Sequence, residues 1–242
     1  MKAMILAAGL GTRLRPLTEH RPKALVELCG TPLLEIVIRR LIQAGVDQVI
    51  INVHHLADMI VDYVRTHRGF GIRIEFSYEP VILGTGGGLQ KAAWFLAGEE
   101  PFFLHNVDIL FEMDLSDLLA FHRSHGAVAS LAVQDRPTSR ALVVDSSGRL
   151  CGRKGYPLAR EPEGPVRWVG YNGVQVISPA LLCLLSERPP FSIIDAEVRL
   201  CPEHPILAYD LGSTPWWDLG TKQALLAAEQ AVLEGKLCRW WS

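Results

Sequence analysis

The first half of the chain alternates short apolar runs with segments whose apolar residues recur at helical spacing. The runs with the length and composition of strands are 3–7, 49–53, 72–76 and 101–104. The segments that predict helices are 32–44, with Thr31 as N-cap, about 56–66 and, after a glycine-rich start, 84–97. This alternation predicts an α/β fold with a Rossmann-like, mostly parallel sheet flanked by helices.

The second half has a less regular pattern. The strands predicted there are 127–133, 141–144, 166–177 and 206–210. Short helices are predicted near 179–185 and 194–201, and a last helix follows Thr221. No repeat or linker is visible, so we predict a single domain over 1–242. Its halves are about 1–110 and about 111–242, and the second contains a smaller β-rich lobe.

Ligands of parallel sheets bind beside the carboxyl ends of the strands. In this chain the predicted strand ends are followed by a glycine turn after Leu6 and by the segments 52–55, 79–88 and 106–108. We therefore expect these segments to gather on one face of one sheet.

Composition narrows the class of protein. The chain has 242 residues, 49% hydrophobic and 21% charged, with a net charge of −2, so no basic field for nucleic acid is indicated. We expect no membrane span and no signal peptide. Five cysteines without a CxxC pair argue against zinc and disulfides and favour the cytoplasm. Trp240 and Trp241 suggest a docked tail or an oligomer contact.

The turn after the first strand combines glycine with fixed positive charge. Gly9 and Gly11 allow close backbone approach, and Arg13, Arg15 and Lys23 lie beside them. The dinucleotide fingerprint is excluded because it needs a third glycine where Leu14 stands, and no P-loop sequence is present. The turn is therefore either a phosphate site of another kind or a plain connection.

Two acids and a glycine run are further candidates. Asp108 and Asp218 lie in apolar surroundings, where two carboxylates suit Mg²⁺ bound with substrate phosphates. Each has an alternative role, Asp108 as a cap after its strand and Asp218 as an acid at a helix N-terminus. The run Leu83–Gly88 suggests either close approach to a flat ligand or phosphate, or a mobile loop.

Together these stretches resemble the sugar-1-phosphate nucleotidylyltransferases (NDP-sugar pyrophosphorylases), in a short form without a β-helix domain. Residues from Leu6 to Lys23 fit the opening signature L-A-A-G-x-G-T-R-L-x-P-L-T followed by P-K. The run at 83–88 is similar to L-G-T-x-G-x, residues 106–108 to N-[GA]-D, and residues 217–221 to W-x-D-x-G-T. Val107 departs from the second element, and at Arg153–Lys154 the acid of the family's E-K-P element is missing.

The resemblance implies specific roles. Nucleotide-binding residues would be Leu6, Ala8, Gly9, Gly11, Thr12, Arg13, Glu79, Gly84 and Thr85. Arg13 and Lys23 would be catalytic. Sugar-binding residues would be Asn106, Tyr171 and Asn172, and Asp108 and Asp218 would hold Mg²⁺. The first half would then bind the nucleotide, and the second half would bind the sugar and carry the C-terminal helix.

The implied reaction joins an NTP and a sugar 1-phosphate to give an NDP-sugar and pyrophosphate, in a monomer or small homo-oligomer. In its short length the chain resembles two groups of enzymes, the N-acetylmuramic acid 1-phosphate uridylyltransferases and the small mannose- or heptose-1-phosphate guanylyltransferases. We favour the first group. A phosphocholine cytidylyltransferase and a non-catalytic homologue that binds NDP-sugars are the alternatives.

Overall fold

The computed structural model describes residues 1–237 and 241, and it divides into two compact units. Unit 1 contains residues 1–82, 105–112 and those from 214 onward, and unit 2 contains 83–104 and 113–213. This division differs from the predicted one near residue 110, because the last segment belongs with the first and residues 83–104 belong with the second half. In the described part of the chain, no helix has the length and apolarity needed to cross a membrane.

Unit 1 is built on a parallel sheet, as the alternating pattern predicts. Its strands are β1 (Lys2–Leu6), β4 (Gln48–Val53) and β5 (Arg73–Tyr78), in that order. Leu6 lies opposite Asn52, and Asn52 lies opposite Ser77. The carboxyl ends of the three strands therefore meet at one edge, where ligands of such sheets bind.

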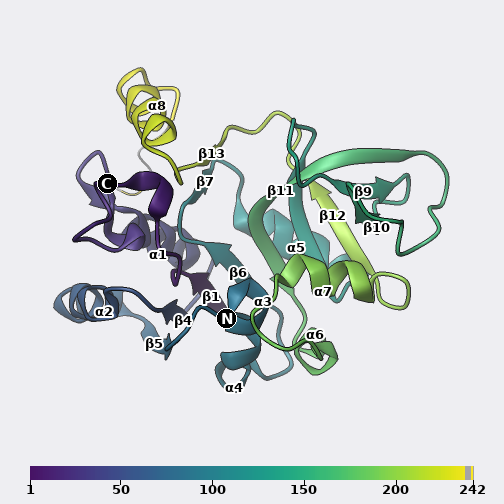
Figure 1. The fold of residues 1–242 in the computed structure, drawn as a ribbon, viewed down its shortest axis with the longest axis horizontal. Coiled ribbons are helices and arrows are strands. Elements are labelled where there is room, and N and C mark those ends of the chain that lie inside the picture. The colour runs from purple at the N-terminus through teal and green to yellow at the C-terminus, as the bar shows by residue number, and fades with distance from the viewer. Residues whose placement is uncertain (238–240, 242) are drawn as a thin grey trace. The chain divides into compact units, whose positions relative to one another are not determined.

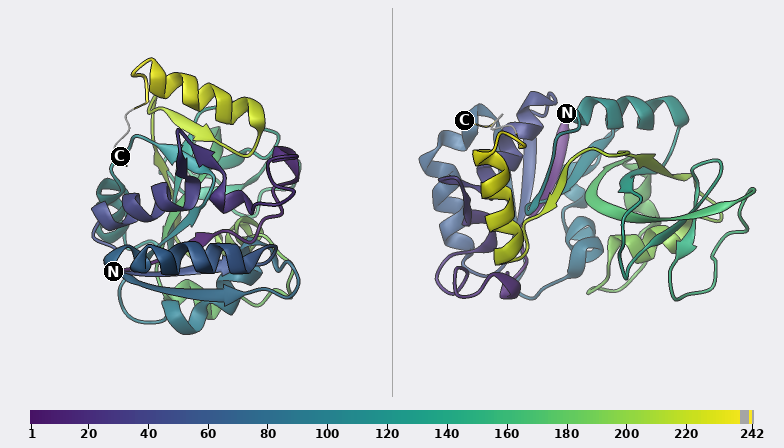
Figure 2. Two further views of the ribbon diagram at one scale, coloured as in Figure 1. Left: turned by 90° about the vertical axis from the view of Figure 1, so that its left-hand side faces the viewer. Right: turned by 90° about the horizontal axis from the view of Figure 1, so that it is seen from above.

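Helices α8 (Lys222–Leu233), α1 (Leu33–Gln43) and α2 (Ala57–Thr66) lie in that order on one side of unit 1 (Figures 1 and 2). The prediction that Thr31 caps α1 is wrong. Thr31 and Pro32 form the short strand β3, which pairs with β2 (Glu27–Leu28), and no side chain caps the helix. Short 3-10 helices at Thr12–Leu14, Lys23–Leu25 and Arg68–Gly71 complete this part of the unit.

Strand pairing brings the end of the chain back to unit 1. Strand β13 (Trp216–Asp218) runs antiparallel to β7 (Ile109–Phe111). Leu219 and Leu225 beyond it join Leu14 and Leu28 in a buried apolar cluster that also includes Trp241. The prediction of a docked tail is therefore confirmed for Trp241, whereas Trp240 lies outside the described residues.

Unit 2 is mostly antiparallel. The long strand β11 (Val166–Ile177) pairs with β9 (Leu142–Asp145) and then with β8 (Ala129–Gln134). Strand β10 (Leu150–Arg153) joins β9, and β12 (Ile206–Asp210) runs parallel to β8. Strand β6 (Phe102–Asn106) passes from unit 2 into unit 1. The helices of unit 2 are α3 (Gly84–Lys91), α4 (Ala93–Leu96), α5 (Leu115–His125), α6 (Ala180–Leu184) and α7 (Ile193–Leu200).

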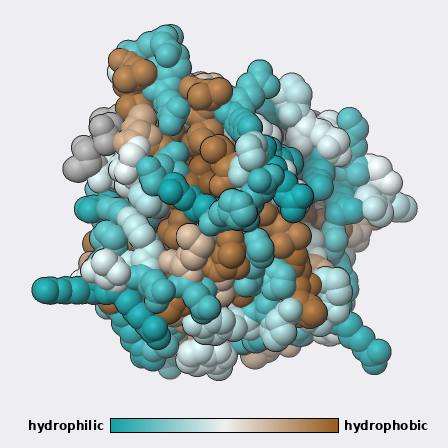
Figure 3. Space-filling view, turned by 60° about the vertical axis from the view of Figure 1, so that its left-hand side comes forward, coloured by the Kyte–Doolittle hydropathy of each residue, from teal (hydrophilic) through white to brown (hydrophobic). Residues whose placement is uncertain are grey.

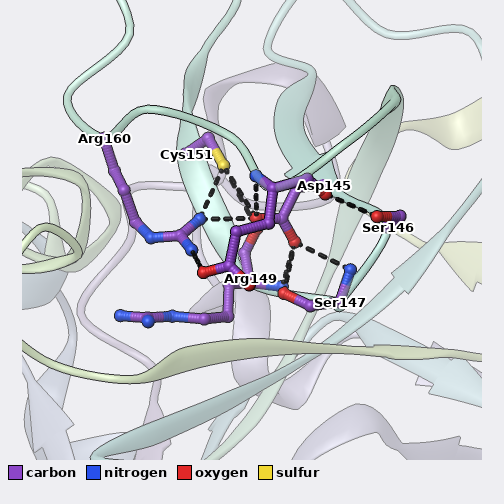
Figure 4. A network of polar contacts seen from close by, with 7 residues as sticks. Asp145, Ser146, Ser147, Arg149, Cys151 and Arg160 are labelled. Carbon is purple, nitrogen blue, oxygen red and sulfur yellow. Dashed lines mark hydrogen bonds and ion pairs between the residues drawn. The ribbon is translucent and has the colours of Figure 1, made fainter.

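A buried carboxylate organises one end of the β9–β10 hairpin (Figure 4). The Asp145 side chain is fully buried and accepts bonds from the Ser147 hydroxyl at 2.7 Å and from Arg160 at 2.5 Å. Burial by itself raises the pKa of Asp145. Hydrogen bonds from Ser147, the Glu163 amide and Arg160 outweigh that effect, so the pKa lies well below its usual range.

This network gives a stability prediction. We expect Asp145→Asn to lower the free energy of unfolding by about 3–5 kcal/mol, because Arg160 loses a buried counter-ion. The Asp145 pKa is lowered by folding, so its contribution is complete above the unfolded pKa of about 3.9 and is lost as pH falls below it. Urea unfolding between pH 7 and pH 3 tests this, with the exposed pair of Glu100 and Arg123 as control. A cost no larger than that of Glu100→Gln would contradict it.

Hydrophobic side chains also reach the surface of unit 1, on the side that carries α8 (Figure 3). Leu226 and Leu233 of this helix are 65% and 80% exposed. They lie one heptad apart, on one face of the helix.

Candidate active site

The glycine turn begins directly after β1, and its geometry depends on Gly11. Gly11 has φ of +64°, in the left-handed region, and its carbonyl accepts bonds from the Leu14 amide and the Thr18 hydroxyl. A β-carbon at Gly11 would lie 2.9 Å from Thr18 Cγ2 and 3.0 Å from Lys23 Cβ. Lys23 thus packs closely against the turn. Gly9, Thr12 and Arg13 are exposed, so their backbone and side chains can meet a ligand.

We expect Gly11→Ala to lower the free energy of unfolding by about 1–2 kcal/mol through its backbone conformation alone. The contact with Thr18 and Lys23 adds a further ~1–3 kcal/mol of overpacking. Gly45→Ala is the matched control, because Gly45 has φ of +82° and nothing within 4 Å of its added β-carbon. Chemical denaturation of both variants measures the difference. Equal losses of unfolding free energy in Gly11→Ala and Gly45→Ala would show that the contact of the added β-carbon with Thr18 and Lys23 has no cost.

Two buried side chains hold the start of the turn. Asn52, at the end of β4, accepts a bond from the Ala7 amide at 2.7 Å and donates to the Glu79 carboxylate at 2.7 Å. Both side chains are 3% exposed. Glu79, a predicted nucleotide-binding residue, is thus linked through Asn52 to the Ala7 amide at the start of the turn. The bracing role of Asn52 was not predicted, although its place at a strand end was a signal.

Lys23 and Asp108 form an ion pair, and their side chains are only 14% and 12% exposed. Lys23 opens a short 3-10 helix, and Asp108 follows β6 by two residues. The structure thus brings together a predicted catalytic cation and a predicted metal ligand that are 85 residues apart. An ammonium group has three donors, so two remain for phosphate oxygens while one is held by Asp108.

The second predicted metal ligand, Asp218, lies in the neighbouring strand. It is opposite Ile109 in the β7–β13 pair, and the Leu219 amide donates to the Asp108 carbonyl at 2.8 Å. Asp218 Oδ1 lies 4.0 Å from Arg13 Nη2 and accepts a bond from the Gly220 amide at 2.9 Å. Two cations from the turn region and two carboxylates from two distant segments therefore lie in unit 1.

These carboxylates fit a magnesium ion. Mg²⁺ is usually held by one or two carboxylates, with phosphate oxygens and water as the other ligands. Within the described residues, no three histidine, cysteine, aspartate or glutamate side chains form a metal-binding group. A site of Asp108 and Asp218 would therefore need ligands from a substrate.

Asn106, a predicted sugar-binding residue, ends β6 and is partly buried. Its carbonyl is bonded to His105 Nδ1 at 2.7 Å. Burial lowers the pKa of His105 to about 4, so this imidazole is neutral at physiological pH. Val107, the departure from the family pattern, is 2% exposed, and its amide donates to the Leu6 carbonyl.

In unit 2 the glycine run 84–88 forms the first turns of α3, and its close contacts are with its own chain. β-carbons at Gly84 and Gly86 would collide with Phe191, and one at Gly87 would lie 2.9 Å from Pro189. These contacts give the glycines a role within the fold, and their predicted approach to a flat ligand or a phosphate stays a prediction. The mobile-loop alternative is wrong, because the run begins helix α3. The Thr85 hydroxyl accepts a bond from the Ile193 amide at 2.9 Å, at the start of α7.

Tyr171 and Asn172 lie on β11 of unit 2, where Tyr171 is opposite Val133 of β8. Tyr171 is partly buried, and Asn172 is completely buried. Burial, and then the nearby carboxyl of Glu197, raise the pKa of Tyr171 well above its usual value. Burial also raises the pKa of Glu197 to about 8.

Comparisons with known proteins agree with this architecture. The chain is 31% identical over 241 residues to mannose-1-phosphate guanyltransferase 2 of Candida glabrata, covering 97% of this chain and 65% of the relative. It is 34% identical over 234 residues to mannose-1-phosphate guanylyltransferase catalytic subunit beta of Danio rerio, covering 93% and 63%. The chain thus spans less than two thirds of the length of these curated relatives.

Solved structures show the same fold. A putative glucose-1-phosphate thymidylyltransferase from Bacillus anthracis has a TM-score of 0.80 at 18% identity, covering 100% of this chain and 98% of that one. UDP-glucose pyrophosphorylase from Acinetobacter baumannii has a TM-score of 0.79 at 23% identity, covering 96% and 93%. The model of the nucleotidyl transferase family matches residues 2–147, more than half of the sequence. The chain therefore belongs to the nucleotidyl transferase family.

Proposed function

We propose that the protein transfers a nucleotidyl group from an NTP to a sugar 1-phosphate, giving an NDP-sugar and pyrophosphate, with Mg²⁺ as cofactor. The observation that carries this proposal is the cluster of Lys23, Asp108, Arg13 and Asp218 beside the glycine turn. Two cations suit a triphosphate, and two carboxylates suit the metal that accompanies it. The names of the relatives support the same chemistry.

The residues have separate tasks in this reaction. The exposed backbone of Gly9 and Thr12 would bind the triphosphate, and Arg13 would neutralise the leaving pyrophosphate. Lys23 would contact both substrates and reduce the repulsion between their phosphates. Asp108 and Asp218 would hold Mg²⁺, which supplies further charge neutralisation. No protein nucleophile is needed, because the acceptor phosphate oxygen attacks the α-phosphorus directly and catalysis depends on positioning.

We expect the acceptor substrate to be a sugar 1-phosphate. The names of the relatives make GTP with mannose 1-phosphate the first pair to test, and UTP with N-acetylmuramic acid 1-phosphate is the second. Phosphocholine stays an alternative acceptor, and the assay below includes it.

The test is a matrix of five NTPs against several sugar 1-phosphates and phosphocholine, with pyrophosphate release as the readout and Mg²⁺ present or chelated. We expect release only with an NTP, a sugar 1-phosphate and Mg²⁺ together. Release with phosphocholine and CTP would favour the cytidylyltransferase alternative. Binding of NDP-sugars without release under any condition would identify a non-catalytic homologue.

A further inference from the structure

The peptide group that joins β1 to the glycine turn is held at both of its ends. Its carbonyl, from Leu6, accepts a bond from the Val107 amide at 3.2 Å. Its N–H, from Ala7, donates to Asn52 Oδ1 at 2.7 Å. In a parallel sheet such an N–H ordinarily bonds to the backbone of the neighbouring strand, whereas here a side chain receives it. Val107 and Asn52 together therefore set the plane of this peptide.

The turn continues with a run of amides that donate no hydrogen bond within the described part of the chain. They belong to residues 8–13. The next amide that donates is that of Leu14, which reaches the Gly11 carbonyl at 2.9 Å. Successive backbone donors without partners form a concave site for an anion. Ala7 is thus the last fixed donor before this run, and the direction of the run depends on the peptide at its start.

Asn52 can hold this peptide because its own side chain has one orientation. A backbone amide only donates, so Asn52 Oδ1 faces Ala7, and its Nδ2 donates to Glu79 Oε1 at 2.7 Å. Glu79 is fixed in turn, since its amide donates to the Val53 carbonyl at 2.8 Å and its carbonyl is bonded to His54 Nδ1 at 2.7 Å. Asn52 and Glu79 are each 3% exposed, so water competes little for these bonds.

All of these groups belong to unit 1, which also contains the four charged side chains of the candidate active site. We propose that Asn52 is a positioning residue for the triphosphate. It fixes the peptide between residues 6 and 7 and thereby aims the amides of residues 8–13 at the phosphates. Glu79 acts on the triphosphate through Asn52. The inference rests on the proposed function, which supplies the triphosphate as the ligand.

Inorganic tripolyphosphate is the probe, because it has the phosphates of an NTP but neither base nor ribose. Its affinity is measured by titration calorimetry without Mg²⁺, at pH 6 and pH 9, for the wild type and for Asn52→Asp. The variant keeps an oxygen for the Ala7 amide but places a second carboxylate against Glu79. Two such carboxylates share a proton at lower pH and repel each other once both are ionised.

At pH 9 we expect Asn52→Asp to bind tripolyphosphate roughly 10-fold more weakly than the wild type, the usual effect of one lost hydrogen bond. The loss should be smaller at pH 6. Each value is compared with that of the wild type at the same pH, because the charge of the probe itself changes with pH. In turnover at pH 9, the variant should raise KM for the NTP and leave KM for the acceptor unchanged.

Two further variants separate positioning from folding. The double variant Asn52→Asp, Glu79→Gln restores a donor opposite the new carboxylate, with the direction of the bond reversed, so it should bind tripolyphosphate as the wild type does at both pH values. Ser77→Ala is the matched control. Ser77 lies opposite Asn52 in the β4–β5 pair and is 4% exposed, and its hydroxyl has no partner among the described residues. Its loss should leave the affinity unchanged.

A purely structural role of Asn52 would lower the free energy of unfolding in urea without changing the affinity for tripolyphosphate, and that result would overturn the proposal. So would a double variant that binds no better than Asn52→Asp at pH 9, or a Ser77→Ala variant that binds as weakly. If binding follows the predicted pattern but no NTP and acceptor release pyrophosphate, the proposed reaction fails while the positioning role of Asn52 stands.

Discussion

Asp108→Asn is expected to reduce kcat by about 10²–10³-fold while the protein stays folded, because it removes one of two carboxylates that would hold Mg²⁺. Asparagine keeps the shape of the side chain and an oxygen acceptor for Lys23, so the ion pair becomes a hydrogen bond. The measurement is steady-state pyrophosphate release at several Mg²⁺ concentrations. The variant should also need more Mg²⁺ for half-maximal rate.

The control for this variant is Asp62→Asn, which removes an exposed carboxylate of the same unit far along the chain from the site. It should leave kcat and the dependence on Mg²⁺ unchanged. If Asp108→Asn retained the wild-type rate and the wild-type response to Mg²⁺, Asp108 would be a structural cap, the alternative that its sequence position left open.

Lys23→Met is expected to be costly in two ways. It leaves the Asp108 carboxylate, 12% exposed, without its counter-ion, and breaking a buried pair in this manner usually costs about 3–5 kcal/mol of folding stability. It also removes a cation that would contact the phosphates, with an expected loss of about 10²–10³-fold in kcat/KM. Urea unfolding and pyrophosphate release measure the two effects separately.

The double variant Lys23→Met, Asp108→Asn distinguishes the two causes. Neutralising Asp108 should restore a large part of the lost stability, because no unpaired charge remains buried. It should restore none of the activity, because both the proposed catalytic cation and the proposed metal ligand are then missing. If the double variant lost as much free energy of unfolding as the two single variants together, Lys23 and Asp108 would not be coupled.

The sequence predicts most of the fold where apolar periodicity is strong. Strands β11 and β12 have the predicted bounds, and β1, β4 and β5 are parallel as expected. Helix α5 was not predicted, because its first turn mixes acids with apolar residues. Its signals were an N-cap at Asp114, which accepts a bond from the Ser116 amide, and Gly126 in the left-handed region after its end.

For the candidate site too, a local sequence pattern could be predicted, whereas contacts between distant segments could not. The segment from Leu6 to Lys23 could be identified because its glycines and cations are contiguous. The pairing of β13 with β7, which brings Asp218 near Asp108, depends on a contact between segments about 100 residues apart, and no local pattern reports it. The contacts of the glycines at 84 to 87 with Phe191 were not predicted, because a sequence does not show which distant side chain comes close to a glycine.

The most direct test of nucleotidyl transfer follows two labels of one nucleotide. An NTP labelled at the α-phosphate or at the γ-phosphate is incubated with a sugar 1-phosphate, Mg²⁺ and the protein, and the products are separated. We predict that the α-label appears in the NDP-sugar and the γ-label in pyrophosphate, in equal amounts and at equal rates. Release of the γ-label as orthophosphate, or an α-label that stays in the NTP with every acceptor, would contradict the account.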